Sequence, residues 1–507
     1  MQGAALPGRP VSLWVDTAPK TTYPTLQPDL SVDVAIAGGG IVGLTAALLL
    51  KRAGKRVAVV EAGRVGTGVT GHTTGKISSL QQITYTQIRS KFGKKGARAY
   101  GEANEAAIEQ VASLVADEGI DCDFQRRDNY TWTELPQGLS TIQREAELAE
   151  ELGLPASFTE DVPLPFPVAG AVRFTDQAQF HPLKYLAGLA ERVDGDGSHV
   201  FEETRALDVD HGRPCTLKTD KGELTADDVI VATNVPFTLR GLYFARSHPH
   251  RSYLIAVRLR GELPTSMSIN DQSNVRSLMP YSVNGTQLLL VGGEGHKSGQ
   301  GGDIAERYRA LEQFARDRFD VESVEYRWAT QDGIPVDKVP YVGRLTRFTR
   351  HTYVATGFRK WGLSNGTAAA MILSDTITGG DERSWAKLFR STRLKPFASA
   401  RSYVTENANS GRRLMLDRFG RPKLTLDELA NGEGAVIKQG REKLAAYRDD
   451  QGTLHAVSPV CTHLQCIVEF NNAERTWDCP CHGSRFDHRG EVLQGPAVER
   501  LEPKDIS

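Results

Sequence analysis

A glycine-rich turn between an apolar strand and an apolar helix constrains this chain more than any other part of its sequence. Residues 33–63 read DVAIAGGGIVGLTAALLLKRAGKRVAVVEAG, in which Gly38, Gly40 and Gly43 fit G-x-G-x-x-G. The first glycine allows a tight turn, the second lets the backbone approach a pyrophosphate, and the third packs the helix on the strand. Glu61 ends the second strand, where an acidic side chain accepts ribose hydroxyls. A glycine turn that binds no ligand would not need the strand, the helix and the acidic residue at these spacings. We therefore predict a dinucleotide-binding unit, and the motif alone does not distinguish FAD from NAD.

Cysteine and histidine crowd into one short stretch near the C-terminus. They form the pairs C-x-H and C-x-x-H, made by Cys461 with His463 and by Cys479 with His482. Two thiolates and two imidazoles at this spacing favour a metal site, and the set also suits zinc. A zinc site alone leaves the neighbouring Cys466 and Cys481 without a role. The pattern therefore predicts a metal centre with two further cysteines beside it.

Length and composition exclude several classes of protein. The 507 residues imply roughly three domains of usual size. Lys plus Arg is 61 and Asp plus Glu is 62, so the net charge of −1 gives no pull toward nucleic acid or an anionic membrane. Six cysteines in so long a chain exclude a disulfide-built secreted scaffold. The N-terminus lacks the pattern of a signal peptide, and the longest apolar stretch, residues 34–50, holds four glycines. We therefore expect no membrane span and a cytoplasmic location.

The rest of the chain divides into segments of different pattern. Residues 1–30 are rich in Pro, Thr and Ala without periodicity, and we expect an arm on the surface. Residues 96–119 repeat apolar residues at helical spacing and end at Gly119, a natural helix stop. Residues 391–421 are basic, polar and poorly periodic, which favours a linker. Short β-like runs such as GAVIKQ and KLAAYRD then predict a small all-β domain over residues 422–507.

Three segments before the linker resemble one family of FAD proteins. They are the glycine segment above, GVTGHTTGK (68–76) and VATGF (354–358), and they are similar to the D-amino acid oxidase and glycine oxidase family over residues 31–380. The resemblance implies an α/β Rossmann-like FAD-binding domain with an interleaved α+β substrate domain. Within residues 31–390, it implies FAD-binding parts at about 31–115, 180–245 and 330–380, and substrate-domain parts at about 116–179 and 246–329.

The same resemblance implies which residues bind FAD. The pyrophosphate is expected over the glycine turn, the ribose on Glu61, the adenine near Ala206, and the isoalloxazine beside residues 70–76. The predicted cofactor-binding residues are Gly38, Gly40, Ile41, Val42, Gly43, Glu61, Ala62, Thr70, His72, Thr73, Thr74, Lys76, Ala206, Ala232, Thr233, Gly357, Trp361, Gly362 and Asn365. Two roles stay open for His72: it lines the pocket, which we favour, or it carries FAD covalently, as in some relatives.

The electron donor is expected to be an organic substrate. A reductase that takes hydride from NAD(P)H normally carries a second G-x-G-x-x-G, and GGEGHKSGQGG (292–302) has the wrong register. By the resemblance, the substrate is an amine or amino acid, oxidised at the carbon next to nitrogen. The run LLLVGG (288–293) lacks the Lys that oxidases of the sarcosine type keep over the flavin, which favours a dehydrogenase. The predicted catalytic residues are Tyr281, His296, Lys360 and Trp361. The alternative for the aromatic residues is a structural role in the core, and the alternative for Lys360 is a solvated position on the surface.

The C-terminal stretch resembles the Rieske domain of cytochrome bc complexes. By that resemblance Cys461 and Cys479 hold one iron of a [2Fe–2S] cluster, and His463 and His482 hold the other. Neutral imidazole in place of thiolate removes negative charge and favours the reduced state of the cluster.

The resemblance also extends to residues around the expected cluster. Cys466 and Cys481 match the pair that forms a disulfide between the cluster loops, and two free buried thiols are the alternative. Residues 495–497 match a third, proline-containing loop. Ser484 is retained, but Phe486 stands where high-potential members have Tyr. The missing O–H donor predicts a lower reduction potential.

Together the two sites predict an oxidoreductase with two redox cofactors. Substrate delivers a hydride to FAD, and the electrons pass singly through the cluster to an external acceptor protein, quinone or oxygen. The imidazole edge at His463 and His482 is the expected exit. The alternative is an FAD and Rieske electron-transfer component that serves a partner enzyme. We expect no nucleic-acid partner.

Overall fold

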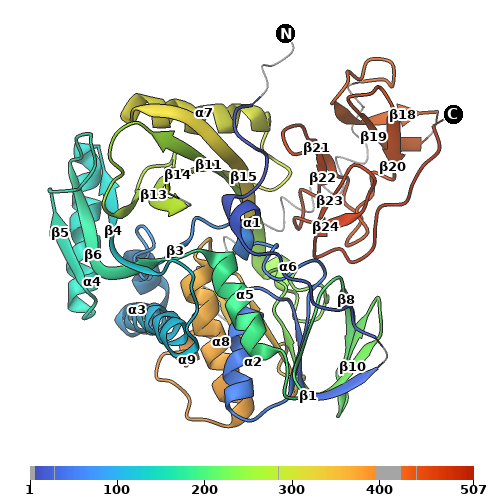
Figure 1. Ribbon diagram of the computed structural model, residues 1–507, viewed down its shortest axis with the longest axis horizontal. Helices are drawn as coiled ribbons and strands as arrows, with labels where there is room; N and C mark the ends of the chain where they lie inside the picture. The colour runs from blue at the N-terminus through green and yellow to red at the C-terminus, as the bar shows by residue number, and fades with distance from the viewer. Residues whose placement is uncertain (1–5, 28, 284, 394–423, 441, 507) are drawn as a thin grey trace.

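The computed structural model describes residues 6–27, 29–283, 285–393, 424–440 and 442–506. Two large sheets with their helices form a two-sheet part, residues 6–393, and two small sheets form a C-terminal domain, residues 424–506 (Figure 1). Residues 394–421 of the predicted linker lie outside the described residues.

The first sheet forms the centre of the expected dinucleotide-binding unit. Its strand order is β16-β17-β10-β1-β2-β7, with β9 also pairing β10 and β8 pairing β9. The four residues of β2 are all buried, as expected for a parallel strand covered on both faces. Helix α2 packs between α5 and α8 on one face (Figure 1). The bounds are β1 Leu30–Ala37, β2 Val57–Val60, β7 His199–Phe201, β8 Ala206–Asp210, β9 Cys215–Thr219, β10 Glu223–Val231, β16 Tyr341–Arg344, β17 Thr352–Thr356, α2 Ile41–Arg52, α5 Pro182–Val193 and α8 Gly362–Thr378.

Parallel pairing brings the motif residues of this sheet to one edge. Strand β1 pairs in parallel with both β2 and β10. The three strands end at Ala37, Val60 and Val231, so the residues that follow them, Gly38, Glu61 and Ala232, meet at their carboxyl ends. This is where open α/β sheets bind ligands.

The second sheet is mostly antiparallel and lies above the first in Figure 1. Its order is β15-β11-β14-β13-β12-β4-β6-β3, with β5 paired to β6. The long helix α3 ends at Gly119 with φ 62°, as its sequence predicts. The bounds are β3 Lys76–Ile77, β4 Gln125–Thr133, β5 Ala156–Thr159, β6 Gly170–Gln179, β11 Ser247–Leu259, β12 Met267–Asn270, β13 Arg276–Val283, β14 Thr286–Lys297, β15 Val321–Pro335, α3 Tyr85–Glu118, α4 Leu139–Glu151 and α7 Ile304–Arg318.

The two sheets take their strands alternately along the chain. The first sheet uses segments within 30–60, 199–231 and 341–356, and the second uses segments within 76–179 and 247–335. This interleaving confirms the predicted fold class. The short helices that complete the two-sheet part are α1 Leu13–Thr17, η1 Thr70–His72, η2 Pro136–Gly138, α6 Tyr243–Arg246 and α9 Ala386–Phe389.

The N-terminal arm is largely exposed or half-buried, but it is anchored in the protein at α1. Leu13 and Trp14 of α1 are fully buried. The Trp14 indole donates to the carbonyl of Thr73 at 2.7 Å, and its ring meets the Tyr281 ring edge-on at 4.8 Å. Ser12 caps α1 and donates its hydroxyl to Gly71. The arm therefore supports the loop at residues 70–76.

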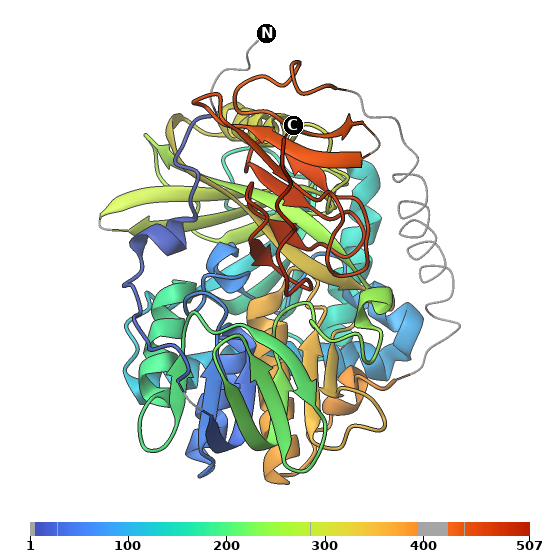
Figure 2. The ribbon, with the colours of Figure 1, turned by 90° about the vertical axis from the view of Figure 1, so that its right-hand side faces the viewer.

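The C-terminal domain is all-β, as predicted, and its two sheets are β18-β19-β20 and β21-β22-β23-β24. A core that includes Tyr447 of the first sheet and Trp477 and Phe486 of the second joins the two sheets. Figure 2 shows this domain against the two-sheet part, on the side of the long strands of the second sheet. The bounds are β18 Gly434–Gln439, β19 Glu442–Arg448, β20 Leu454–Val457, β21 Glu469–Asn471, β22 Thr476–Asp478, β23 Arg485–Phe486 and β24 Val492–Gln494.

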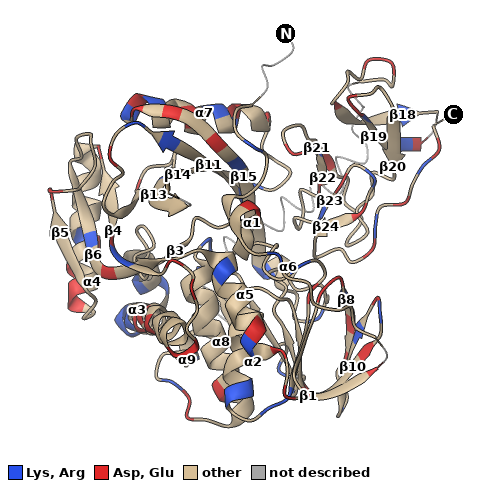
Figure 3. Cartoon of the chain, viewed as in Figure 1, with Lys and Arg blue, Asp and Glu red and all other residues tan. Residues whose placement is uncertain are grey.

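Acidic and basic side chains are mixed along the elements. Helix α7 reads IAERYRALEQFARDR and carries both signs, as Figure 3 shows. Among the described helices, none is long and apolar enough to cross a membrane.

Candidate functional site

A cavity of about 560 Å³ opens at the carboxyl edge of the first sheet, beneath the second sheet. Most of the predicted cofactor-binding residues line it: Gly38, Gly40, Ile41, Val42, Glu61, Ala62, Thr70, His72, Thr73, Thr74, Lys76, Ala206, Ala232, Thr233, Trp361 and Gly362. Gly43, Gly357 and Asn365 lie outside the set of lining residues. Gly43 acts through packing, since a Cβ there would lie 1.9 Å from the carbonyl oxygen of Gly38.

The glycine turn forms a cradle for phosphate. Gly38 has φ +113°, and a Cβ on it would lie 2.6 Å from the carbonyl oxygen of Ala232, so only glycine fits without strain. Gly40 caps α2 without a side-chain hydrogen bond to the helix, and the Ile41 N–H donates to Thr70 Oγ1 at 3.3 Å. Such a helix start binds anions. These residues therefore fit the pyrophosphate of a dinucleotide.

Glu61 is fixed above this cradle by backbone donors. Its Oε2 accepts from the Gly39 N–H at 2.8 Å, and its Oε1 accepts from the Gly63 N–H at 3.0 Å. Burial raises the pKa of this carboxyl. Each oxygen keeps lone pairs for another donor, which fits the predicted contact with ribose hydroxyls.

The loop at residues 70–76 places two titratable side chains in the cavity. Nδ1 of His72 lies 2.8 Å from the carbonyl oxygen of Gly68, so Nδ1 carries the proton and Nε2 is free of it. Lys76 is buried, and its Nζ donates to the Ser268 carbonyl at 3.0 Å and to Ser277 Oγ at 2.6 Å. Burial lowers the pKa of Lys76 to about 7. An amine poised between its two protonation states therefore lies in the cavity.

Two of the four predicted catalytic residues, Lys360 and Trp361, line the cavity. Lys360 has φ +72°, and its N–H donates to Asp332 Oδ2 at 2.6 Å. Its side chain reaches water because it faces the cavity, yet the protein atoms around it lower its pKa to about 8. Burial raises the pKa of Asp332 to about 6. Lys360 therefore lines the cavity with an exposed side chain, and its catalytic role stays a prediction.

The other two, Tyr281 and His296, are not among the residues that line the cavity. The Tyr281 hydroxyl donates to Asp123 Oδ2 at 2.6 Å. His296 Nδ1 donates to the Lys297 carbonyl at 2.6 Å, and its Nε2 accepts from the Tyr253 hydroxyl at 2.8 Å. Burial lowers the pKa of His296 to about 4, which keeps the ring neutral. Both side chains are thus satisfied away from the cavity.

The cavity wall also contains residues that the sequence analysis did not identify. From the two-sheet part they include Arg205, Gln331, Asp332 and Arg359. From the C-terminal domain they are Arg485, Leu493, Gln494, Gly495, Ala497 and Val498. The C-terminal domain thus forms part of this wall, and no local sequence signal shows which distant segment docks there.

The predicted metal ligands of the C-terminal domain come together. Cys461 and Cys479 are each 1% exposed, and their thiols lie within hydrogen-bond reach, which lowers the pKa of Cys461 to about 7. The rings of His463 and His482 lie 5.1 Å apart. Both Nδ1 atoms are buried and without a hydrogen-bond partner among the described residues. Two thiols and two unused imidazole nitrogens therefore fit a dinuclear iron site with mixed ligands.

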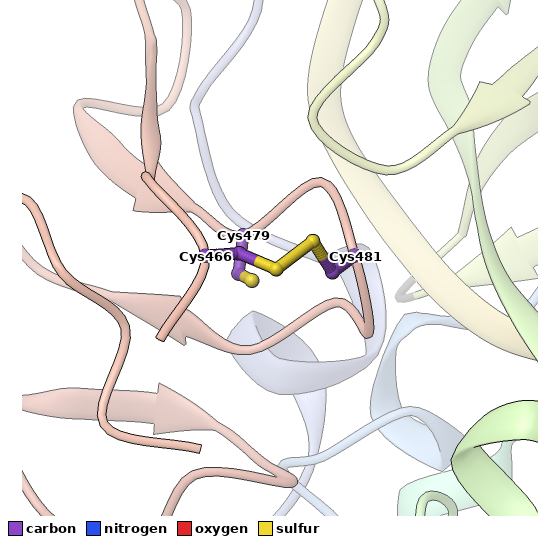
Figure 4. A group of neighbouring side chains, drawn as sticks. All are labelled: Cys466, Cys479 and Cys481. Atoms are coloured by element: carbon purple, nitrogen blue, oxygen red, sulfur yellow. A yellow bond between two sulfur atoms is a disulfide. The ribbon is translucent and has the colours of Figure 1, made fainter. Parts of the chain in front are cut away.

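The remaining two cysteines form the predicted disulfide, Cys466–Cys481, and the alternative of two free thiols is wrong. Figure 4 shows this bond beside Cys479. The sulfurs of these three residues lie within 4.8 Å of one another. A sulfur in a disulfide cannot act as a thiolate ligand, so Cys466 and Cys481 do not belong to the set of metal ligands.

The third loop closes over the same place. Ser484 is fully buried, and its Oγ accepts from the Ala497 N–H at 3.0 Å. This hydrogen bond joins the predicted third loop, residues 495–497, to the loop that contains Cys479 and His482. Phe486 is fully buried as well. Both residues that the sequence analysis associated with the reduction potential therefore lie inside the domain.

The imidazole edge meets the two-sheet part, and its role as the exit to an acceptor stays a prediction. The Phe244 ring of α6 lies 5.2 Å from the His482 ring and 5.9 Å from that of His463. His482 is 9% exposed. His482 is therefore covered within the molecule, whereas His463 is half-buried.

Comparisons with known proteins agree with both sites. The family described as FAD dependent oxidoreductase (DAO) matches residues 33–376, and the family Rieske [2Fe-2S] domain matches residues 422–504. YhfW of Bacillus subtilis (strain 168), which bears the name of a Rieske 2Fe-2S iron-sulfur protein, is 36% identical over 500 residues, 98% of this chain and 98% of that protein. The second match means that the metal centre is a [2Fe–2S] cluster and not zinc.

More distant relatives match the two-sheet part. Gamma-glutamylputrescine oxidoreductase of Escherichia coli (strain K12) is 25% identical over 378 residues, 71% of this chain and 87% of that protein. The solved structure of glycine oxidase from Geobacillus kaustophilus has a TM-score of 0.61 and 18% identity, covering 72% of this chain and 99% of the other. The glycine oxidase match shows a shared fold.

Proposed function

Because this chain belongs to the DAO family of FAD dependent oxidoreductases and carries a Rieske [2Fe-2S] domain, we propose that it oxidises an amine or amino acid at the carbon next to nitrogen. The electrons then pass singly through the cluster to an external acceptor. The enzyme class and the two cofactors follow from the family matches. The substrate, the acceptor and the residue roles are the proposal.

The observation that carries the proposal is one cavity with three walls. The nucleotide-binding turn supplies one wall with Gly38, the second sheet supplies another with Tyr253, and the C-terminal domain supplies a third with Arg485. A cavity lined by both domains supports the proposal, because a substrate bound there would lie against the Rieske domain as well as the FAD-binding turn. If the chain were only a fusion of two electron carriers, the two domains would not need to line a common cavity.

The reaction balances with the groups at hand. FAD, when bound, accepts the hydride from carbon. An amine R₂CH–NH₂ loses two electrons and two protons to give an imine, and water converts the imine to a carbonyl compound and ammonia. Buried apolar residues of the wall, such as Leu254 and Ile269, exclude bulk water, and Lys360 supplies a positive charge. Two one-electron acceptors, or one two-electron quinone or oxygen, are consumed for each amine.

We propose Cys461, His463, Cys479 and His482 as the cluster ligands, on the geometry given above. The expectation of a dehydrogenase rested on the missing Lys in residues 288–293. Lys76 supplies a cavity amine from another element, so this argument no longer separates dehydrogenase from oxidase. The cytoplasmic location stays a prediction from the sequence.

Anaerobic screening of amines tests the proposal. Because the relatives include a gamma-glutamylputrescine oxidoreductase and a glycine oxidase, the first compounds are gamma-glutamylputrescine and glycine, followed by other amines and amino acids. We expect one of them to bleach the flavin absorbance, followed by the EPR signal of the reduced cluster. Bleaching by NADH alone, with no response to amines, would favour the electron-transfer component instead. Repeating the active reaction in air shows by hydrogen peroxide whether oxygen is the acceptor.

A further inference from the structure

Gln331 links the cavity to the cluster loop. It lies on β15, is 2% exposed and lines the cavity. Its side-chain Nε2 donates to the carbonyl oxygen of Gly483 at 2.6 Å, and its Oε1 accepts from the Ser298 hydroxyl at 2.6 Å. Gly483 follows directly after His482, a proposed cluster ligand. One side chain therefore spans the distance from the flavin cavity to the backbone beside a ligand.

The cluster loop fits closely against the two-sheet part at this point. A Cβ on Gly483, which has φ +81°, would lie 2.6 Å from Pro249 Cβ and 2.7 Å from Gln331 Nε2. On the opposite side, a Cβ on Gly299, at φ +65°, would lie 2.6 Å from the Cα of Pro480. Glycines on both sides thus permit backbone contact at the turn that contains His482.

A buried ion pair fixes this arrangement. Arg251 of β11 is 1% exposed and its Nη2 lies 2.6 Å from Glu474 Oε2 of the C-terminal domain. Glu474 also pairs with Arg485, which bonds to Asp478 at 3.0 Å. Separating the two parts would break this hydrogen-bonded ion pair, in which Arg251 is almost completely buried in the docked arrangement. The docked arrangement is therefore the stable one.

We propose that Gln331 is a positioning residue for electron entry into the cluster, and this rests on the proposed function. By holding the Gly483 carbonyl, Gln331 keeps the His482 side of the cluster loop against the cavity wall. Each amine yields two electrons, and these cross the contact one at a time. An external acceptor takes each electron from the cluster before the next one enters. The two protons leave to water. Electrons therefore enter on the side that faces the two-sheet part and leave from another face.

The test uses light in place of substrate. Blue light with EDTA under argon reduces the flavin of the holoprotein without any amine, and freeze-quenched EPR then follows the appearance of the reduced cluster. In Gln331→Leu, which keeps the volume and removes both hydrogen bonds, we expect the cluster signal to appear about tenfold more slowly. Flavin photoreduction and the cluster midpoint potential should stay as in wild type. Wild-type kinetics in this variant would overturn the proposal, and since no amine is used, the proposed function is judged separately.

Two matched variants separate positioning from docking in general. Asn472→Ala removes an exposed hydrogen bond between the domains, Asn472 Nδ2 to Asp303 Oδ1 at 3.0 Å, and should leave the rate at the wild-type value. Phe244→Leu removes the ring against His482 but leaves the Gln331 contact in place. If either variant slows transfer as much as Gln331→Leu, Gln331 has no special role and the proposal is wrong.

A fourth variant keeps the proposal testable if Gln331→Leu does not retain its cluster. Gln331→Asn keeps the amide but is one methylene shorter, so it cannot reach the Gly483 carbonyl in the present backbone. We expect slowed transfer in this variant with a normal midpoint potential. Transfer at the wild-type rate would overturn the proposal.

Discussion

Arg251 and Glu474 form a buried ion pair across the boundary between the two-sheet part and the Rieske domain. Nη2 of Arg251 donates to both carboxylate oxygens, at 2.7 and 2.6 Å. Arg251 is 1% exposed and sits on a strand of the second sheet, whereas Glu474 sits between β21 and β22. Arg251 takes its carboxylate partner from the other domain, whereas Glu474 also pairs with Arg485 of its own domain, so the stability of the buried Arg251 depends on docking.

Removing the carboxylate should therefore destabilise the whole protein. Glu474→Ala leaves Arg251 buried without its partner, and breaking one side of such a pair costs about 3–5 kcal/mol. We expect a clear fall in Tm by calorimetry and faster hydrogen exchange in β11 and β22.

Arg475→Ala is the matched control for this effect. Arg475 adjoins Glu474 in the sequence but pairs with Asp450 at the surface, where both side chains are about half exposed. An exposed pair contributes about 1 kcal/mol or less. Equal losses in the two variants would contradict a special role for the buried pair.

The glycine turn makes a second prediction. Gly38→Ala adds a Cβ at φ +113° and at 2.6 Å from the Ala232 carbonyl oxygen, so both strain and a clash follow. We expect purified protein with little bound FAD, measured as the absorbance ratio at 450 and 280 nm. Gly54→Ala, also at positive φ (+83°) but with open space around it, should cost about 1 kcal/mol of stability and retain FAD. Full FAD content in Gly38→Ala would be the contrary result.

Local patterns predicted the parts of the site that depend on neighbours in sequence. Gly38 and Gly43 are set by the turn they form, and Cys461 with His463 lies on one loop. Such features need few distant contacts, so a short segment contains the information.

Features that depend on distant segments escaped the sequence. Trp14 reads as part of a polar arm, yet it is buried against Tyr281, far along the chain. Arg485 lines the cavity because a whole domain docks there, and Tyr281 turns toward Asp123 and not toward the cavity. The partner of each residue lies on an element whose position only the tertiary packing decides.

The reduction potential gives a third prediction, from Phe486. Because its ring replaces a Tyr of high-potential members, Phe486→Tyr should restore an O–H donor to a ligand sulfur and raise the midpoint potential. A hydrogen bond of about 1 kcal/mol corresponds to roughly 40 mV for one electron. Redox titration followed by EPR measures this shift. Phe470→Tyr, elsewhere in the same domain, should leave the potential unchanged, and an unchanged Phe486→Tyr would argue against the mechanism.

Lys76 gives a prediction about pH. Its pKa is lowered by burial from 10.5 to about 7, so between these values the unfolded chain holds a proton that the folded chain lacks. Stability therefore rises with pH across this window, and below pH 7 the buried charge costs the folded state on the order of 3 to 5 kcal/mol. In FAD-free protein, Lys76→Met should have a higher Tm than wild type at pH 6, and the difference should shrink as the pH approaches 10.

A surface lysine separates this effect from a general change of charge. Lys94 is half exposed and pairs with Glu151 at 3.0 Å, so Lys94→Met changes the net charge by the same amount without removing a buried amine. Its Tm should follow that of wild type in parallel from pH 6 to pH 10. If the Lys76→Met curve also runs parallel to wild type, the amine is not neutralised by burial, and Lys76 enters the cavity as a permanent cation.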